Sequence, residues 1–230
     1  FAYEEKTAPL EVLKLEVNPG DKIAVLGAVG SGKSTFLKLL AGLYRPQSGK
    51  VFLDGVDMQL IAVEFLREQI GYLPQDVRLF NGSLRENLVL GLPVLSDSQV
   101  LEAASKTGLD NAIQGHPKGL DIQITEGGKG LSGGQRQLVG LTRMLLAKPK
   151  MILLDEPTAS MDGPLEDRVL DHLFTSQGEK SVIIMATHKS SAMRHVNRII
   201  VIEAGRVAMD GPKERVIEEL NRQAAARRSK

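Results

Sequence analysis

The sequence lacks cysteine throughout its 230 residues, which excludes a disulfide framework and any metal site built on thiolates. It also lacks a net charge of either sign, because 29 Lys and Arg stand against 28 Asp and Glu for a formal charge of +1. Without a basic excess we expect no nucleic-acid partner. No apolar run approaches the ~18 residues of a membrane-spanning helix, and the first residues do not resemble a signal peptide.

The length and the apolar spacing indicate the fold class. A chain of 230 residues can form one large domain or two small ones. Short apolar runs alternate with helical or turn-rich segments, which favours a mostly parallel α/β sheet buried on both faces. We expect strands at residues 22–26, 51–53, 70–73, 151–154, 182–186 and 199–202.

Residues 84–147 differ from the rest of the chain, because they have helical spacing and no convincing strand. We therefore expect a helical subdomain inserted between two parts of an α/β core, residues 1–83 and 148–230. Gly55 and Gly205 lie between short strands and are expected in turns. The last segment starts with Pro212 and continues with good helix formers, which predicts a final helix.

The stretch "GAVGSGKST" follows an apolar strand and fits the pattern G-x-x-x-x-G-K-S/T with Gly27, Gly32, Lys33 and Ser34. Glycines at such a strand-to-helix turn, Gly30 among them, let backbone N–H groups approach a phosphate without a Cβ in the way. The lysine supplies a positive charge for the β- and γ-phosphates, and the serine offers a hydroxyl to Mg²⁺. The alternative is an ordinary glycine-rich turn with a surface lysine.

A second informative stretch is "MILLDEPTASMD", in which four apolar residues lead into Asp155. This pattern places a carboxylate at the C-terminal end of a buried strand, where open α/β sheets bind ligands, and it can hold Mg²⁺ there. Glu156 comes one residue later and could position the attacking water of a phosphoryl transfer. The alternative is a strand that ends in two solvated acids.

The third stretch, "LSGGQRQ", combines a hydroxyl, two glycines and an amide just before a helix. It is either an ordinary N-cap with Ser132 as the capping residue or a second helix N-terminus that receives an anion. If both phosphate receptors serve one nucleotide, the simplest geometry is a head-to-tail dimer with ATP between the subunits.

These motifs together resemble the nucleotide-binding domain of ATP-binding cassette (ABC) transporters, over essentially the whole chain. "GAVGSGKS" is similar to the Walker A loop, "MILLDE" to the Walker B strand and "LSGGQ" to the family signature. The resemblance implies one ABC ATPase domain spanning residues 1–230, with ATP and Mg²⁺ as cofactors. It also implies a P-loop NTPase core with a mostly parallel sheet, an N-terminal antiparallel β portion and an inserted helical signature subdomain.

The same resemblance implies roles for four more residues. Tyr3 matches the aromatic that stacks on adenine, and Gln75 in "GYLPQD" matches the glutamine that reaches Mg²⁺ and water. His188 matches the switch histidine near the γ-phosphate, and Asp162 matches the aspartate that crosses the dimer interface. The implied catalytic residues are Lys33, Gln75, Glu156 and His188, and the implied metal ligands are Ser34, Gln75 and Asp155. The implied nucleotide contacts are Tyr3, Gly27, Gly30, Ser31, Gly32, Lys33, Ser34, Thr35, Gln75, Ser132, Gly133, Gly134, Gln135 and Asp162.

The sequences that flank these motifs resemble the corresponding segments of ABC exporters. "PQDVRLFNGSLRENL" is similar to the segment that docks on the membrane domain, and "TEGGKGLSGGQ", which contains Glu126, resembles the X-loop of exporters. "HPKGLD" and "MDGPKERV" look most like the type I secretion ATPases of Gram-negative bacteria. Thr125 and the run Ala159-Ser160-Met161 depart from the usual pattern without removing a group needed for hydrolysis.

The resemblance implies a motor domain at the cytoplasmic face of the bacterial inner membrane, working as a homodimer through an ATP sandwich. Its other implied partners are a transmembrane domain of the same polypeptide, expected before residue 1, a periplasmic adaptor, an outer-membrane channel and an exported protein. One alternative is an ABC exporter of lipids, drugs or peptides. A soluble, non-transporting ABC ATPase is a more distant alternative.

Overall fold

The structure is a computed structural model that describes residues 1–2, 10–128 and 130–228. Its centre is a six-stranded sheet with the order β10-β9-β1-β8-β7-β4. Neighbouring strands run parallel, except that β10 pairs antiparallel with β9. The strands are β1 (Lys22–Leu26), β4 (Ile70–Leu73), β7 (Met151–Asp155), β8 (Val182–Ala186), β9 (Arg198–Glu203) and β10 (Arg206–Pro212). The predicted fold class, a mostly parallel α/β sheet with some antiparallel strands, is confirmed.

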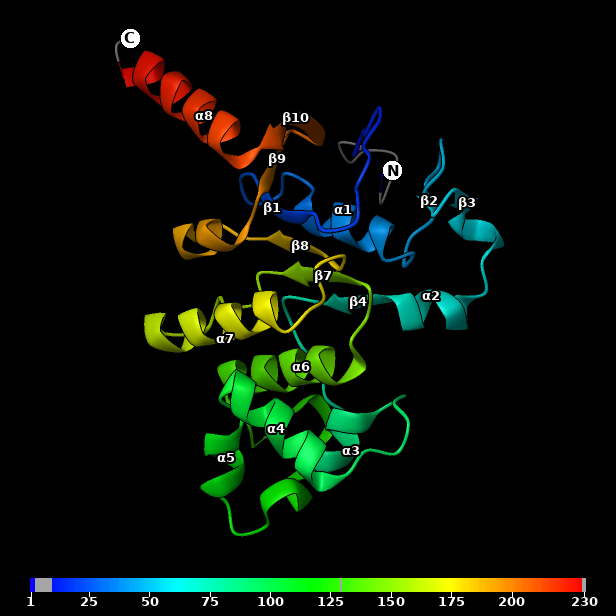
Figure 1. Cartoon of the computed structure of the whole chain (residues 1–230), viewed down its shortest axis with the longest axis vertical. Helices are drawn as coiled ribbons and strands as arrows, with labels where there is room; N and C mark the ends of the chain where they lie inside the picture. Colours follow the sequence, from blue (N-terminus) through cyan, green and yellow to red (C-terminus); the bar gives the residue numbers. More distant parts are fainter. Residues whose placement is uncertain (3–9, 129, 229–230) are drawn as a thin grey trace.

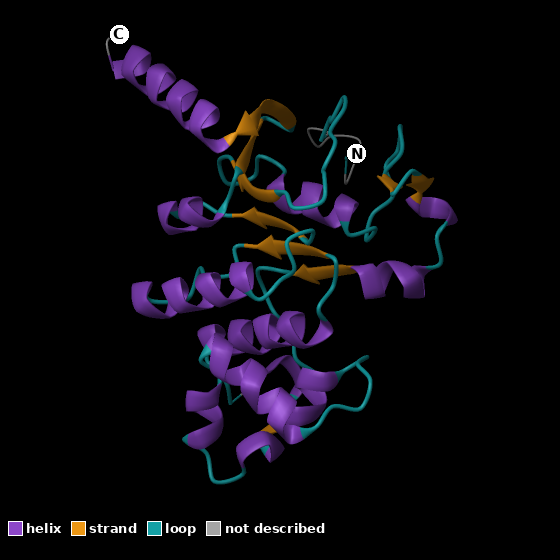
Figure 2. Cartoon of the chain, viewed as in Figure 1, coloured by secondary structure: helices purple, strands orange, loops and turns teal. Residues whose placement is uncertain are grey.

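The central strands are buried on both faces because alternate residues pack against different helices. In β7, Leu153 belongs to the hydrophobic cluster that contains Phe36 and Leu37 of α1, whereas Ile152 and Leu154 belong to the cluster with α6 and α7. Helices therefore cover both faces of the sheet (Figure 2). The helices are α1 (Lys33–Leu40), α2 (Val63–Gln69), α3 (Leu84–Val89), α4 (Asp97–Thr107), α5 (Asp110–Gln114), α6 (Gly133–Ala147), α7 (Gly163–Thr175) and α8 (Lys213–Arg228).

Helices α3 to α6 form the part of the molecule farthest from α8 in Figure 1. Three of them begin with the capping pattern S-x-x-E/Q, in which a serine side chain and the residue three positions later bond each other's backbone N–H: α3 from Ser83, α4 from Ser96 and α6 from Ser132. Their apolar side chains share one core with the sheet. The division into a core and a helical subdomain at residues 84 and 147 stays a prediction.

Several short elements complete the chain. The 3-10 turns are η1 (Met58–Leu60), η2 (Gly119–Asp121), η3 (Glu126–Gly128) and η4 (Ser190–His195), and two small antiparallel pairs join β2 (Phe52–Leu53) to β3 (Val56–Asp57) and β5 (Gly82–Ser83) to β6 (Gln123–Ile124). Strand β6 lies inside the block for which the sequence predicted no strand. Gly55 and Gly205 occupy the predicted turns, with φ values of 80° and 76°.

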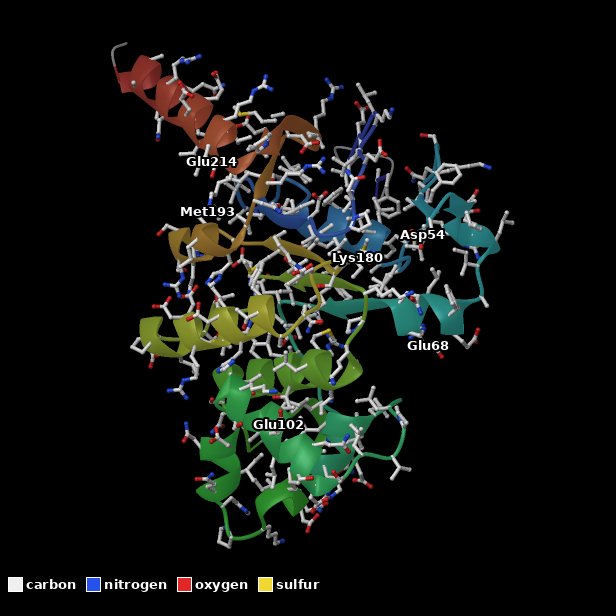
Figure 3. All side chains as sticks on the ribbon, in the orientation of Figure 1. Asp54, Glu68, Glu102, Lys180, Met193 and Glu214 are labelled. Carbon is white, nitrogen blue, oxygen red and sulfur yellow. The ribbon has the colours of Figure 1, made fainter. Side chains whose placement is uncertain are left out.

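One expected strand lies outside the central sheet, and one strand of that sheet was not predicted. Residues 51–53 do not enter the central sheet; Phe52 and Leu53 form a separate hairpin, in which Phe52 is 59% exposed. The edge strand β10 was not predicted; its side chains alternate between exposed and half-buried positions, and its apolar residues are only Val207, Ala208 and Met209. Charged side chains such as Glu68 on α2, Glu102 on α4 and Glu214 on α8 lie on the outside (Figure 3). Within the described residues, every helix is too short or too polar to span a bilayer.

Candidate nucleotide site

The site lies at the C-terminal edge of the parallel strands, toward which the arrowheads in Figure 2 point. The strands end in register, because Val25 of β1 and Asp155 of β7 both pair with Ala186 of β8, and Leu73 of β4 pairs with Leu154 of β7. The loops that follow these strands therefore meet at one edge, where open α/β sheets bind their ligands.

The loop between β1 and α1 requires glycine at two positions. Gly27 has a φ of 152°, and a Cβ there would come within 2.2 Å of the carbonyl oxygen of Ile202 and 2.6 Å of the Ser31 hydroxyl. Gly32 has a φ of 107° and is the N-cap of α1. The loop can therefore fold tightly and direct the free N–H groups of the helix N-terminus toward an anion.

Lys33 and Ser31 give this loop the chemistry of a phosphate site. The Lys33 ammonium donates to the carbonyl oxygens of Gly27 and Ala28, at 2.8 and 3.0 Å, and the residue is 7% exposed. The buried Oγ of Ser31 has no hydrogen-bond partner among the described residues. A fixed ammonium, an unpaired hydroxyl and a glycine cradle that a Cβ would fill fit a nucleotide's phosphates.

Asp155 supplies the carboxylate of the site at the end of β7 and is only 4% exposed. Burial raises its pKa, although a hydrogen bond from Ser34 acts in the opposite direction and Glu156 adds to the rise. The described residues contain no group of three His, Cys, Asp or Glu that could hold a metal ion by itself. Ser34 and Asp155 are the oxygen ligands that suit Mg²⁺, which usually completes its coordination with phosphates and water.

Glu156 and His188 form a pair beside Asp155. Glu156 has a φ of 48° and its backbone N–H donates to Ala186 of β8 at 2.9 Å. Its Oε2 lies 3.2 Å from Nδ1 of His188, two residues past the end of β8. A carboxylate beside an imidazole can orient a water and accept or share its proton.

The other three predicted residues, Gln75, Asp162 and Tyr3, differ in how the structure places them. Gln75 lies two residues past the end of β4, next to β7 in the sheet, with an exposed side chain. Asp162 caps α7, with its Oδ1 accepting from the N–H of Leu165 at 3.0 Å. Tyr3 lies outside the residues that the structure describes, so its expected stacking on adenine stays a prediction.

The start of α6 combines a completed cap with an exposed glycine. Ser132 Oγ accepts from the N–H of Gln135 at 3.2 Å, and Gln135 Oε1 accepts from the N–H of Ser132 at 2.8 Å. Ser132 and Gly133 are exposed. A Cβ on Gly134 would come within 3.2 Å of the carbonyl oxygen of Ser160. Ser132 thus caps its helix, and the remaining N-terminal groups of this 15-residue helix face outward, where they can bind an anion.

Sequence analysis missed three residues that support the site. Gln137 is buried, and its Nε2 donates to the carbonyl of Glu156 at 3.0 Å. Glu166 and Lys189 form an ion pair of 2.8 Å. Lys189 directly follows His188, which is the signal that could have drawn attention to it; Gln137 and Glu166 have no such mark in the sequence.

A glycine-lined phosphate loop, a buried strand-end aspartate and a Glu–His pair at one edge of a parallel sheet define a P-loop nucleoside triphosphatase domain. The sequence profile described as "ABC transporter" matches residues 10–159. The chain belongs to the ABC transporter family, as the ATPase domain of the kind found in ABC exporters.

Individual relatives are longer than this chain. ABC transporter B family member 14 of Arabidopsis thaliana is 34% identical over 94% of this chain and 17% of its own length. The alpha-hemolysin translocation ATP-binding protein HlyB of Escherichia coli O157:H7 is 36% identical over 91% of this chain and 30% of its own length. The solved structure of a bacterial Atm1-family ABC exporter with ATP bound matches with a TM-score of 0.89 at 30% identity, covering 100% of this chain and 41% of that chain.

Proposed function

We propose that this chain is the Mg²⁺-dependent ATP-hydrolysing motor domain of a membrane exporter of the type I protein secretion class. In this proposal it acts as a head-to-tail dimer around two ATP molecules. The observation that carries the proposal is the meeting of four residues at a single edge of the sheet: Lys33 at the start of α1, Asp155 at the end of β7, and Glu156 and His188 just past the ends of β7 and β8. The four residues come from three separate parts of the sequence: Lys33, the pair Asp155 and Glu156, and His188.

Each residue has a defined part in this proposal. Lys33, Ser31 and the loop amides bind the phosphates, and Ser34 and Asp155 hold the metal, which supplies charge neutralisation when bound. Glu156 positions the attacking water and polarises it, while His188, 3.2 Å from the Glu156 carboxylate, fixes the orientation of that carboxylate. Gln75 completes the site from the neighbouring strand end. Most of the catalysis is positioning and electrostatics.

The N-terminus of α6 supports the dimer. Its exposed Ser132 and Gly133 would contact the γ-phosphate of ATP held by the other protomer, and Asp162 would lie near the same interface. ATP adds hydrogen-bond acceptors and negative charge between two faces that each present N–H groups. Because the nucleotide binds the closed dimer better than the separate chains, it shifts the equilibrium toward the dimer.

The exporter class rests on the relatives. HlyB is named for alpha-hemolysin translocation, which supports an exported protein as substrate. A periplasmic adaptor and an outer-membrane channel as partners, and a place at the cytoplasmic face of the bacterial inner membrane, are further parts of the proposal. A transmembrane domain of the same polypeptide is part of the proposal, because the chain spans 17% and 30% of the two relatives above. Similar identity to a plant B-family transporter and to an Atm1-family exporter, neither of which is named for protein secretion, is why export of lipids, drugs or peptides stays the alternative.

Replacing Glu156 by Gln tests the activity. The amide keeps the size of the carboxylate and removes the charge that orients water, so ATP turnover should fall by a factor on the order of 10² or more. Binding of a fluorescent ATP analogue should keep its affinity. The matched control is Glu68→Gln, which changes an exposed glutamate on α2 and should leave turnover unchanged. Near-parental turnover in Glu156→Gln would show that the catalytic carboxylate lies elsewhere.

The substrate class needs the whole exporter. In the full-length protein reconstituted in lipid vesicles, the secretion segment of an exported repeat-in-toxin protein should stimulate ATP hydrolysis. Stimulation by a lipid or a hydrophobic drug alone, with no response to the secretion segment, would favour the alternative class.

A further inference from the structure

Glu166 is a buried carboxylate with a complete set of partners outside the phosphate loop. It lies in the first turn of α7 and is 5% exposed. Its Oε1 accepts from the hydroxyls of Thr158 and Ser191, at 2.9 and 2.7 Å, and its Oε2 accepts from the ammonium of Lys189 at 2.8 Å. Burial by itself raises the pKa of Glu166, but the hydrogen bonds from Lys189, Ser191 and Thr158 outweigh it and leave the pKa below its ordinary value. The carboxylate is therefore ionised at neutral pH.

Lys189 uses all of its donors on one segment of chain and on Glu166. Besides the ion pair, its ammonium donates to the carbonyl oxygen of Thr158 at 2.7 Å and to that of Met161 at 3.5 Å. An ammonium has three N–H donors, so every donor has a partner. The loop at 158–161 and the segment at 187–191 are thus joined through one pair of charges, in which Glu166 is buried and Lys189 is half-buried.

One joined segment contains His188, and the other begins two residues after Glu156. Thr158 comes two residues after Glu156, and the N–H of Ala159 donates to the Glu156 carbonyl at 3.2 Å. Lys189 directly follows His188, which is exposed and contacts the Glu156 carboxylate at 3.2 Å. Because His188 and Lys189 share a peptide bond, the contacts that fix Lys189 against Glu166 also restrict where the His188 side chain can lie beside Glu156.

We infer that the Glu166–Lys189 pair is a positioning device that holds His188 and the loop after Glu156 in the geometry needed for hydrolysis. The inference rests on the proposed function, because it takes Glu156 and His188 as the residues that act on the water. A well-packed apolar pair could stabilise the same place at least as well. Unlike an apolar pair, a fully hydrogen-bonded charge pair also fixes the positions of its partners, because each short hydrogen bond holds one backbone or side-chain group in a defined geometry.

The test is a double-mutant cycle with Lys189→Met, Glu166→Gln and both changes together. Lys189→Met leaves the buried Glu166 carboxylate without its charge partner, and Glu166→Gln does the same to the half-buried Lys189 ammonium, so each single variant should lower the melting temperature and kcat together. The double variant buries no unpaired charge, so its melting temperature should recover most of the loss; only the bonds from Lys189 to the carbonyl oxygens of Thr158 and Met161 stay missing. Its kcat should stay low, by a factor on the order of 10², because a small misplacement of catalytic groups has an effect of that size. The affinity for ATP should be unchanged, because no residue of the phosphate loop is altered.

The matched control is the exposed ion pair of α4, in which Lys106 contacts Glu102 at 2.6 Å. The double variant Glu102→Gln with Lys106→Met should leave kcat and the melting temperature close to the parental values. An NMR readout of the His188 imidazole should shift in the Lys189/Glu166 double variant and stay in place in the control.

Two outcomes separate the inference from the proposed function. If kcat returns together with the melting temperature in the double variant, the pair is only structural and the inference is overturned, even when Glu156→Gln abolishes turnover. If Glu156→Gln keeps parental turnover, the proposed catalytic site itself is wrong. The inference is supported if the double variant regains its melting temperature and its ATP affinity is retained, but its kcat stays low.

Discussion

At the scale of single residues, Asp155 shows a conflict between stability and function. The sequence places it at the end of an apolar strand, and folding leaves it 4% exposed. Burial raises its pKa, and the opposing hydrogen bond from Ser34 does not cancel the rise. An ionised carboxylate in this position therefore costs the folded protein free energy, and that cost is retained because the same oxygens suit Mg²⁺.

Replacing Asp155 by Asn should raise the melting temperature at pH 7 while abolishing Mg²⁺-dependent turnover. The sign follows from the raised pKa: the contribution to stability is fully present below the unfolded pKa and is lost as pH rises through the folded pKa. The gain of the Asn variant should therefore be largest at neutral pH and disappear in acid, below the ordinary value of 3.8. Melting curves across pH check this, with the exposed Asp76→Asn as control. A variant that is less stable than the parent at pH 7 would contradict it.

At the scale of elements, the contact of α6 with β4 depends on two glycines. A Cβ on Gly71 of β4 would come within 2.7 Å of Met144 Sδ and of Pro149 Cγ. A Cβ on Gly140 of α6 would come within 2.4 Å of Leu73 Cδ1, and Leu73 is 2% exposed. The helix that begins at the signature motif therefore lies directly against the strand that leads to Gln75, with no room for a side chain between them.

Gly140→Ala should destabilise the domain in spite of the better helix propensity of alanine. Overpacking a core costs roughly 1–3 kcal/mol, and the gain in propensity is at most about 1 kcal/mol, so we expect a net loss of about 1 kcal/mol. Urea unfolding measures the difference. Gly163→Ala is the control, because a Cβ there meets open space and should change stability by less than about 0.5 kcal/mol. Equal stability in the two variants would show that α6 can move away from β4 without loss.

At the scale of the whole molecule, the exposed N-terminus of α6 should matter only when two chains meet. In the Glu156→Gln background, ATP with Mg²⁺ should convert a monomer into a dimer in sedimentation experiments. Adding Ser132→Arg places bulk and positive charge against the γ-phosphate of the other chain's ATP and should abolish this conversion. Ser96→Arg is the matched control, because Ser96 has the same capping pattern with Gln99 at the start of α4. It should lose a comparable cap energy of about 1 kcal/mol and still dimerise.

Dimerisation by the variant with both Glu156→Gln and Ser132→Arg would mean that Ser132 only caps its helix. Each chain would then complete its nucleotide site alone. If the Ser96→Arg control also failed to dimerise, the loss of a helix cap would be enough to prevent dimerisation. That result would contradict a specific role for Ser132 at the interface.

The sequence by itself determined the local chemistry of the site. The phosphate loop, the strand-end Asp155 and Glu156, and the start of α6 are contiguous motifs whose function follows from backbone geometry within a few residues. The alternation of apolar runs was enough for the parallel α/β class, because buried strands must be apolar on both faces. Pro212 and the good helix formers after it were enough for α8, which begins at Lys213.

Only the tertiary structure decided which distant residues meet. Phe52 belongs to an apolar run like those of the central strands, yet it lies in a separate hairpin, because strand pairing depends on partners far along the chain. Gln137 reaches the Glu156 carbonyl, and Glu166 binds Lys189, only after α6, α7 and β8 have packed beside β7. Such contacts carry no local pattern, because each is fixed by the packing of whole elements and by the requirement that buried polar groups find partners.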